Sequence, residues 1–169
     1  MTRSEKREAS YKKRMEYFAE HPKVALQIHM INQVVTWIHF GAYPLLLIWL
    51  LLNHDSNLAK AIIIPLDSFI ILSVFRYLIN RKRPYEKYGV GPAIAKDTKG
   101  KSFPSRHVFC AFVIAMTFVF VFPHLWCGIC LFIMGLVLAV LRVTAGVHYI
   151  SDVIAGAICG IVAGLFYLI

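Results

Sequence analysis

The sequence predicts an all-α fold: a polytopic transmembrane helix bundle of about five spans, preceded by an amphipathic helix at the membrane interface. Hydrophobic residues make up 59% of the 169 residues, whereas soluble domains contain ~45–50%, and the mean hydropathy is +0.64. The apolar residues form long runs nearly free of charge, and a helix needs ~20 of them to cross a bilayer. We therefore expect one membrane domain, residues 24–169, after a basic amphipathic segment, residues 1–23.

The N-terminal segment differs in composition from the rest of the chain. Residues 4–21 are helix-prone and highly charged, which predicts a helix at a surface or membrane interface. No signal peptide is expected, because the first 23 residues lack an apolar core.

The first long apolar run, residues 24–53, is harder to interpret. As a helix its 30 residues would span roughly 45 Å, which is too long for one upright span and too short for two. Gly41 and Pro44 interrupt the run. We expect an interfacial lead-in followed by one span.

Four further apolar runs complete the five spans, and a tight turn at Pro123 and His124 joins two of them into a hairpin. The last run carries Gly156, Gly160 and Gly164, a small-residue stripe that permits close helix contact. One loop, rich in proline and glycine, is expected at a membrane surface because irregular backbone is not tolerated in lipid. The four runs are residues 61–80, 105–122, 125–141 and 153–169, and the loop is residues 81–104.

The charge distribution limits the classes of partner. The net charge is +9, and residues 1–23 and 81–103 carry seven Lys and Arg each. Such clusters can attract anionic lipid headgroups or an anionic substrate. Nucleic acid is not expected, because no soluble basic face is available. The four cysteines all lie in apolar runs, so we expect them to pack between helices rather than form a zinc site or disulfides.

Three short polar stretches break the apolar pattern with arginine and histidine, at positions that fall on one face of the membrane. They are residues 76–84, 104–107 and 142–152. In the first, Arg76 and Arg83 are two helical turns apart, so we expect them on one helix face that ends at Pro84. Paired guanidiniums can chelate one phosphate group. Arg81 and Lys82 are interpreted as cations that extend to the membrane surface.

The other two stretches predict an acid and a nucleophile. Pro104 suits the first turn of a helix, whose free N–H groups and the hydroxyl of Ser105 would bind an anion. His107, in the same turn, could give a proton to a departing alkoxide. His148 and Asp152 are at i and i+4, where a carboxylate could fix the tautomer of a nucleophilic imidazole. Asp152 could also stabilise a helix N-terminus.

These residues resemble the motifs of the type 2 phosphatidic acid phosphatase superfamily, K-x6-R-P, P-S-G-H and S-R-x5-H-x3-D. The resemblance extends from Arg76 to Asp152 in the right order and spacing. Three positions differ: Arg76 stands where the family has Lys, Arg106 replaces Gly, and Leu141 replaces Ser. None of them is the nucleophile, its carboxylate or the acid.

The resemblance implies a role for each matching residue. His148 would attack phosphorus and become phosphohistidine, Asp152 would orient it, and His107 would protonate the leaving oxygen. The phosphate would be held by Arg76, Arg83, Ser105, Arg106 and Arg142. No cofactor and no metal are expected, because arginines stand where a metal enzyme has clustered carboxylates.

The expected function is therefore an integral-membrane lipid phosphatase acting on undecaprenyl diphosphate, phosphatidylglycerophosphate or phosphatidate. A lipid phosphotransferase and, more weakly, a non-catalytic lipid-binding or transport protein are the alternatives. Five spans put the N-terminal segment and the site on one side of the cell membrane. The positive-inside rule favours the cytoplasmic side, whereas the family resemblance implies the outer side. Asp67, an acid inside the second span, could be functional or structural, and nothing indicates the oligomeric state.

Overall fold

Every regular element in the described part of the chain is helical, which confirms the all-α prediction. The computed structural model describes residues 2–96 and 98–169. Its helices are α1 (Arg3–Glu20), α2 (Pro22–Leu52), α3 (Leu58–Ile79), α4 (Pro84–Tyr88), α5 (Arg106–Val121), α6 (Leu125–Thr144) and α7 (Ile150–Leu165), and a 3-10 turn (Phe166–Leu168) follows.

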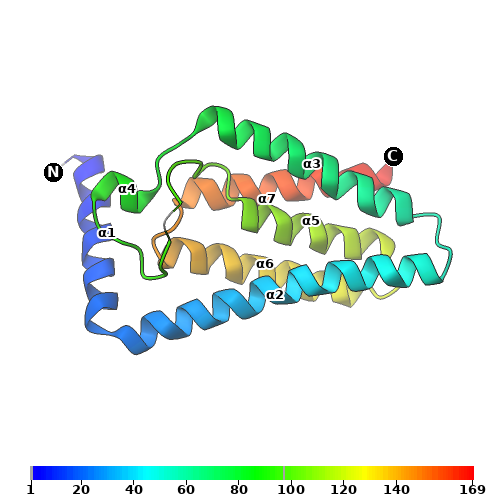
Figure 1. Ribbon diagram of the computed structural model, residues 1–169, viewed down its shortest axis with the longest axis horizontal. Helices are drawn as coiled ribbons and strands as arrows, with labels where there is room; N and C mark the ends of the chain where they lie inside the picture. Colours follow the sequence, from blue (N-terminus) through cyan, green and yellow to red (C-terminus); the bar gives the residue numbers. More distant parts are fainter. Residues whose placement is uncertain (1, 97) are drawn as a thin grey trace.

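Four helical segments are long and apolar enough to cross a membrane, and α5 is a shorter apolar helix. The four are Pro22–Leu52, Leu58–Tyr88, Leu125–Thr144 and Ile150–Leu168. The five long helices run along the length of the molecule, whereas α1 lies across one end beside α4 (Figure 1). The N-terminus is at that end and the C-terminus is at the opposite end (Figure 1).

Helix α5 is the centre of the bundle. Twelve of its sixteen residues are buried, because α6 and α7 pack closely along it and α2 and α3 cover the rest. A helix that is apolar on all sides is stable only when it is enclosed in this way. At ~1.5 Å per residue it is ~24 Å long, shorter than a typical span, and its first turn lies at the end of the bundle that carries α1 (Figure 1).

The small-residue stripe of α7 is the contact surface against α5, as predicted. A Cβ atom added at Gly156 would lie 2.6 Å from the carbonyl oxygen of Ser105, and one at Gly160 would lie 2.8 Å from that of Phe109. These are backbone atoms in a packed helix, so they cannot move aside. The stripe therefore sets the distance between the two helices that carry Ser105 and Asp152.

The prediction for residues 24–53 was wrong in its details. Gly41 and Pro44 lie inside α2, which is one continuous helix of 31 residues and passes along the bundle once. Prolines are tolerated in membrane helices because neighbouring groups and local adjustments satisfy the freed carbonyls. Pro65 lies inside α3 in the same way.

Helix α1 packs onto the loop between α3 and α5 rather than standing free. Tyr11, Met15 and Phe18 of α1 are buried in a cluster against side chains of α2, α4 and the loop. The loop itself includes the short helix α4, and Ala93 donates a backbone hydrogen bond of 3.0 Å to Ala145 at the end of α6. The segment expected to be irregular is thus folded over the end of the bundle.

Candidate active site

The three polar stretches meet at the end of the bundle that carries α1. A cavity of about 360 Å³ opens there. Six of the eight predicted site residues line it, namely Arg76, Arg83, Arg106, His107, Arg142 and His148. The other two, Ser105 and Asp152, are fully buried behind the cavity wall.

His148 is oriented by contacts on both ring nitrogens. Its Nδ1 lies 3.4 Å from Oδ2 of Asp152, and its Nε2 lies 3.4 Å from Nη1 of Arg83. A carboxylate at Nδ1 favours the tautomer with the proton on that nitrogen. The lone pair of Nε2 is then directed to the side where Arg83 and the cavity lie.

The side chains of His148 and Asp152 meet although His148 does not lie in a helix. His148 lies in the turn between α6 and α7, since α7 begins at Ile150. Asp152 reaches back because it is the third residue of α7, where its carboxylate caps the helix by accepting from the backbone N–H of Tyr149 at 3.0 Å. One carboxylate therefore makes both contacts considered for Asp152, one with His148 and one with the start of α7.

Two partners of Asp152 were missed by the sequence analysis. The Arg81 guanidinium pairs with Oδ1 at 2.7 Å and lies over the Tyr149 ring, 4.2 Å from its centre. Ser102 is fully buried and donates its hydroxyl to Oδ2. The interpretation of Arg81 as a cation that merely extends to the membrane surface was thus wrong, whereas Lys82 is exposed. The basic, polar composition of residues 81–104 was the only sequence signal for these contacts.

Arg76 and Arg83 do not share a helix face, contrary to the prediction. Asn80 takes a left-handed conformation (φ 41°) and ends α3, and Arg83 is the residue before α4. Pro84 therefore begins a helix rather than ending one. The two arginines still converge on the cavity because the chain reverses between them.

Both arginines are held by backbone carbonyl oxygens. The Arg76 guanidinium donates to Pro104 and Lys101. Arg83 donates from Nε to Gly100 at 3.0 Å and from Nη1 to Val147 at 3.4 Å. A guanidinium has five N–H donors in a fixed plane. The N–H groups of Arg76 and Arg83 that are not bonded to these carbonyl oxygens are therefore held in position to bind an anion.

The start of α5 also differs from expectation. Helix α5 begins at Arg106 after Ser105, so Pro104 is outside its first turn. The backbone N–H of Ser105 is engaged with the carbonyl oxygen of Asp152 at 2.8 Å, which joins α5 to α7 at the site. The Ser105 hydroxyl oxygen is buried and has no hydrogen-bond partner among the described residues. His107 faces the cavity as predicted.

Positive charge dominates the cavity. Arg142 is only 5% exposed, and its Nε atom has no partner among the described residues. Lys96 also lines the cavity, and burial together with Arg142 and Arg83 lowers its pKa. Burial lowers the pKa of His148 to about 4, although the hydrogen bond that its ring donates to Asp152 acts in the opposite direction. Unfilled buried donors and crowded cations are the environment that an anionic ligand stabilises.

The hydrogen-bond donors that line the cavity are suited to a phosphate group. Over residues 2–96 and 98–169, no group of three His, Cys, Asp or Glu side chains is placed to hold a metal ion. Arginine binds phosphate oxygens with paired hydrogen bonds. A buried histidine with an oriented tautomer can attack phosphorus.

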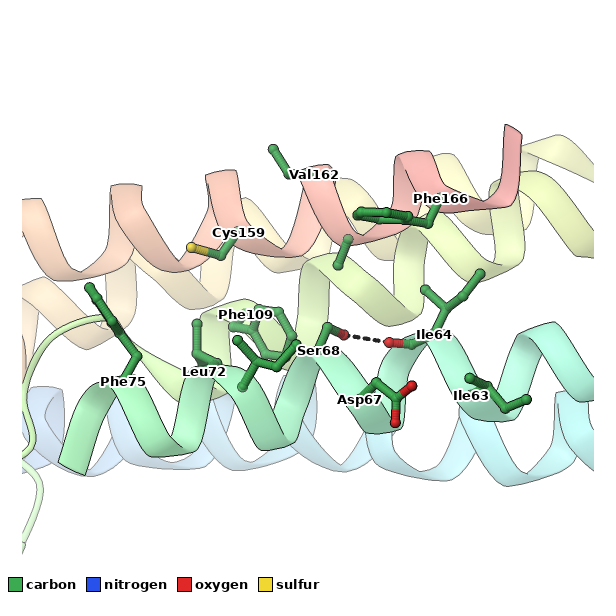
Figure 2. A pocket seen from close by; sticks show the side chains of 12 residues that line it. Ile63, Ile64, Asp67, Ser68, Leu72, Phe75, Phe109, Cys159, Val162 and Phe166 are labelled. Atoms are coloured by element: carbon green, nitrogen blue, oxygen red, sulfur yellow. Dashed lines mark hydrogen bonds between the residues drawn. The ribbon is translucent and has the colours of Figure 1, made fainter. Parts of the chain in front are cut away.

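A second, apolar cavity of about 620 Å³ lies along α3 and α7, with Phe109 of α5 behind it (Figure 2). Its lining includes Phe75, which is next in sequence to Arg76 of the cation-lined cavity. Asp67 and Ser68 are polar residues in its lining, and the Ser68 hydroxyl donates to the Ile64 carbonyl at 2.6 Å (Figure 2). Asp67 is an exposed member of this lining.

Comparison with known proteins identifies the class of protein that this fold and site define. The family model of the PAP2 superfamily matches residues 57–169. The chain therefore belongs to the PAP2 superfamily, and it is a membrane lipid phosphatase, a hydrolase of lipid phosphates.

Individual relatives are about a quarter identical to this chain over the aligned residues. The putative undecaprenyl-diphosphatase YbjG of Escherichia coli (strain K12) is 27% identical over 142 residues, which are 84% of this chain and 70% of that protein. The bacitracin transport permease protein BcrC of Bacillus licheniformis is 27% identical over 146 residues, 81% of this chain and 70% of that protein.

Two solved structures share the fold. The crystal structure of Aquifex aeolicus LpxE superposes with a TM-score of 0.69 at 24% identity and covers 88% of this chain and 87% of that chain. A transmembrane PAP2 type phosphatidylglycerolphosphate phosphatase from Bacillus subtilis superposes with a TM-score of 0.72 at 17% identity, covering 99% of this chain and 86% of that chain. The second likeness includes nearly the whole chain, from α1 to α7.

Proposed function

We propose that the chain hydrolyses a lipid phosphate by attack of His148, through a phosphohistidine and without a metal. The observation that carries this proposal is the position of His148 between Asp152 and Arg83, in the wall of a cavity lined by cations. Catalysis of phosphoryl transfer is mainly positioning and neutralisation of charge on the equatorial oxygens. Arg76, Arg83, Arg106 and Arg142 supply that charge, and buried Ser105 is the remaining predicted phosphate ligand.

The reaction proceeds in two steps. Nε2 of His148 forms a bond to phosphorus while the bond from phosphorus to the lipid oxygen breaks, and His107 gives a proton to that departing oxygen. Water then attacks the phosphohistidine, His107 accepts the proton of that water, and inorganic phosphate and free His148 are released. Asp152 keeps the Nδ1 proton in place and stabilises the positive charge that develops on the ring.

The apolar cavity is the proposed seat of the lipid tail (Figure 2). Residues of α3 line both cavities, Phe75 the apolar one and Arg76 the cation-lined one, which supports this because a lipid phosphate carries its tail next to its charged group. Its volume of about 620 Å³ holds only part of a long lipid, so the rest of the tail would lie in the bilayer. The names of the relatives favour undecaprenyl diphosphate or phosphatidylglycerophosphate as the type of substrate, and the resemblance of the motifs adds phosphatidate.

In the membrane, α2, α3, α5, α6 and α7 are the five proposed spans. Residues 24–169 form the phosphatase domain, and residues 1–23 form a basic helix at the interface. The lengthwise course of the five helices supports this arrangement (Figure 1). The protein is a multi-pass membrane protein, and its proposed location is the cell membrane.

A lipid phosphotransferase would use the same histidine, with a second lipid in place of water. The two functions differ in their products, because only hydrolysis releases inorganic phosphate. A non-catalytic lipid-binding or transport protein would need neither His107 nor His148 in the cavity.

The test is phosphate release by purified protein from a panel of lipid phosphates, with and without EDTA. We expect release that EDTA does not reduce and that His148→Ala abolishes. Loss of activity with EDTA and recovery with Mg²⁺ would refute the metal-free mechanism. Transfer of phosphate to added lipid without free phosphate would establish the phosphotransferase.

A further inference from the structure

The cation-lined cavity extends beyond the residues that hold one phosphate. Besides the predicted residues, its wall includes Lys96, Thr98 and Lys101 of the loop before α5. Six cationic side chains therefore line the cavity, and no carboxylate of the described residues does. A phosphate monoester carries about −2 charge at neutral pH. This excess of positive charge indicates a ligand with a second anionic group.

The position of Lys96 indicates where that group would lie. Lys96 lines the same cavity as His107 and Arg142. His107 is on the side of the leaving oxygen in the mechanism proposed above. A second anionic group on that side would belong to the leaving group, and Lys96 is the cation of the shared lining that we assign to it.

The loop that carries these residues is held in place at both ends. At one end Ala93 bonds to Ala145, and at the other Gly100 donates to Glu86 at 2.8 Å. The Lys101 ammonium lies over the Tyr77 ring, 4.9 Å from its centre. The three side chains are therefore part of the cavity wall rather than of a free surface loop.

We propose that Lys96, Thr98 and Lys101 form a second phosphate subsite, and that the preferred substrate is a lipid diphosphate. This inference rests on the proposed function. His148 attacks the terminal phosphorus, the bond from that phosphorus to the bridging oxygen breaks, and its electron pair leaves with the inner phosphate as a lipid monophosphate. Lys96 neutralises the charge that develops on this leaving phosphate, so the diphosphate depends less on proton donation by His107.

The test measures binding, so it does not depend on turnover. Dissociation constants for farnesyl diphosphate and farnesyl monophosphate, which share one tail, are determined in a His148→Ala background. We expect the added Lys96→Ala change to weaken diphosphate binding by ~10-fold or more relative to monophosphate binding, the size of one charged hydrogen bond. Lys96→Arg should retain the preference. Lys99→Ala is the matched control, because Lys99 is in the same loop but does not line the cavity.

Equal losses for the two ligands, or the same loss in Lys99→Ala, would overturn the second subsite. Hydrolysis of monophosphates through His148 could still stand in that case. Repeating the pair with diacylglycerol diphosphate and phosphatidate distinguishes prenyl from diacylglycerol tails. A selective loss with either pair supports the subsite and identifies the tail that reaches it.

A separate set of contacts links α1 to the turn that carries His148. Tyr11 is 3% exposed, and its hydroxyl lies 3.1 Å from the Val90 carbonyl oxygen and 3.4 Å from that of Gly146. Gly146 has φ +75°, and a Cβ atom there would lie 2.9 Å from the Tyr11 ring. The turn is held from α6 as well, because Val147 and His148 both donate to the Arg142 carbonyl oxygen.

From these contacts we infer that Tyr11 is a positioning residue for His148. The α1 helix supports the outer side of the turn, and the Arg142 carbonyl and the Arg83 guanidinium support the inner side. Without the Tyr11 hydroxyl, the Gly146 carbonyl loses a hydrogen-bond donor two residues before the nucleophile. The orientation of His148 toward phosphorus then becomes less well defined, and such misplacement lowers the rate of the chemical step.

The test compares Tyr11→Phe with Tyr17→Phe, a tyrosine on the same helix that is 48% exposed. We expect Tyr11→Phe to lower kcat by ~3- to 10-fold at unchanged KM, well below its melting temperature, the size of one neutral hydrogen bond. Tyr17→Phe should leave kcat unchanged. A kcat for Tyr11→Phe equal to that of the wild type would overturn the positioning role. A lower Tm with unchanged kcat would show that the contact serves stability alone.

Discussion

Asp152 is the residue on which most contacts of the site depend. Its two carboxylate oxygens accept from the Tyr149 N–H and the Ser102 hydroxyl, pair with Arg81, and lie 3.4 Å from Nδ1 of His148. A carboxylate has about four lone-pair sites, so these partners fill it. A fully paired buried carboxylate keeps one orientation, and it transmits that orientation to the imidazole.

Arg81 should therefore contribute to catalysis even though it does not line the cavity. Replacing Arg81 with Ala leaves one oxygen of the buried Asp152 without its charged partner. We expect kcat to fall ~10-fold, the lower end of the range for a charged hydrogen bond, because the Arg81 side chain is partly exposed. Lys82→Ala, an exposed cation next in sequence, is the control and should retain activity. Equal kcat values for the two variants would contradict the contribution of Arg81.

The protonation of His148 gives a second prediction. Burial lowers its pKa to about 4 from an ordinary value of 6.5. A lowered pKa means that the ring stays neutral, and so nucleophilic, as pH falls toward 5. Histidine NMR in detergent, with the signal assigned by its loss in His148→Ala, should therefore show no titration of His148 between pH 8 and about 5.5. A midpoint near the ordinary value would contradict the buried, unprotonated nucleophile.

At the scale of residues, the spacing of motifs in the sequence was enough to predict the position of some site residues but not of others. Arg76, His107 and His148 could be predicted because each belongs to a polar motif next to an apolar run. Arg81, Ser102 and Lys96 could not, because their positions depend on how residues 81–104 fold back over the bundle. Asn80, in a left-handed conformation, starts the turn by which the chain folds back. The residues between Asn80 and Pro84 do not indicate in which direction the chain turns.

At the scale of elements, the contact between α5 and α7 sets the geometry of the site. Gly160 is buried against the backbone of α5, so Gly160→Ala places a Cβ atom 2.8 Å from the Phe109 carbonyl. We expect destabilisation of ~1–3 kcal/mol, the usual cost of overpacking, measured as a lower Tm in detergent. Gly41→Ala in α2 is the matched control, because nothing lies within 4 Å of its added Cβ. Similar Tm values for both variants would show that α5 and α7 are not in close contact.

The elements themselves were largely predictable from apolar runs, within a few residues at their ends. The errors occurred at proline and glycine. Pro44 and Gly41 do not interrupt α2, because a helix in a membrane bundle keeps its hydrogen bonds where a soluble one would break. Pro84 begins α4 instead of ending α3, because proline also suits the first position of a helix.

At the scale of the whole molecule, the number of lengthwise helices before the site loop determines on which side the N-terminal segment lies, and there are two among the described residues, α2 and α3. The chain starts at the end with the cavity and, after α2, α3, α5, α6 and α7, finishes at the opposite end (Figure 1). The N-terminal segment and the active site should therefore be on the same side of the membrane. The positive-inside rule and the family resemblance favour different sides, but neither changes this relation.

Labelling of single cysteines in intact cells tests this relation, in a variant whose native cysteines have been replaced. We expect a cysteine at Thr2 and one at Lys99, in the loop of the site, to react alike with a membrane-impermeant maleimide. A cysteine at Ile169 should show the opposite reactivity. Opposite reactivity of Thr2 and Lys99 would mean an odd number of crossings before the site loop, and it would contradict the five-span arrangement.

The central claim is that His148 carries the phosphoryl group during turnover. Purified protein is mixed with a lipid phosphate labelled with ³²P, quenched in alkaline detergent within the first turnover, and digested for mass spectrometry. Phosphohistidine is stable in base, so we expect one phosphorylated peptide, with the group on His148. It should be absent in His148→Ala and more abundant when water attack on the intermediate is slowed. A phosphoryl group on His107, or turnover by His148→Ala, would contradict the mechanism.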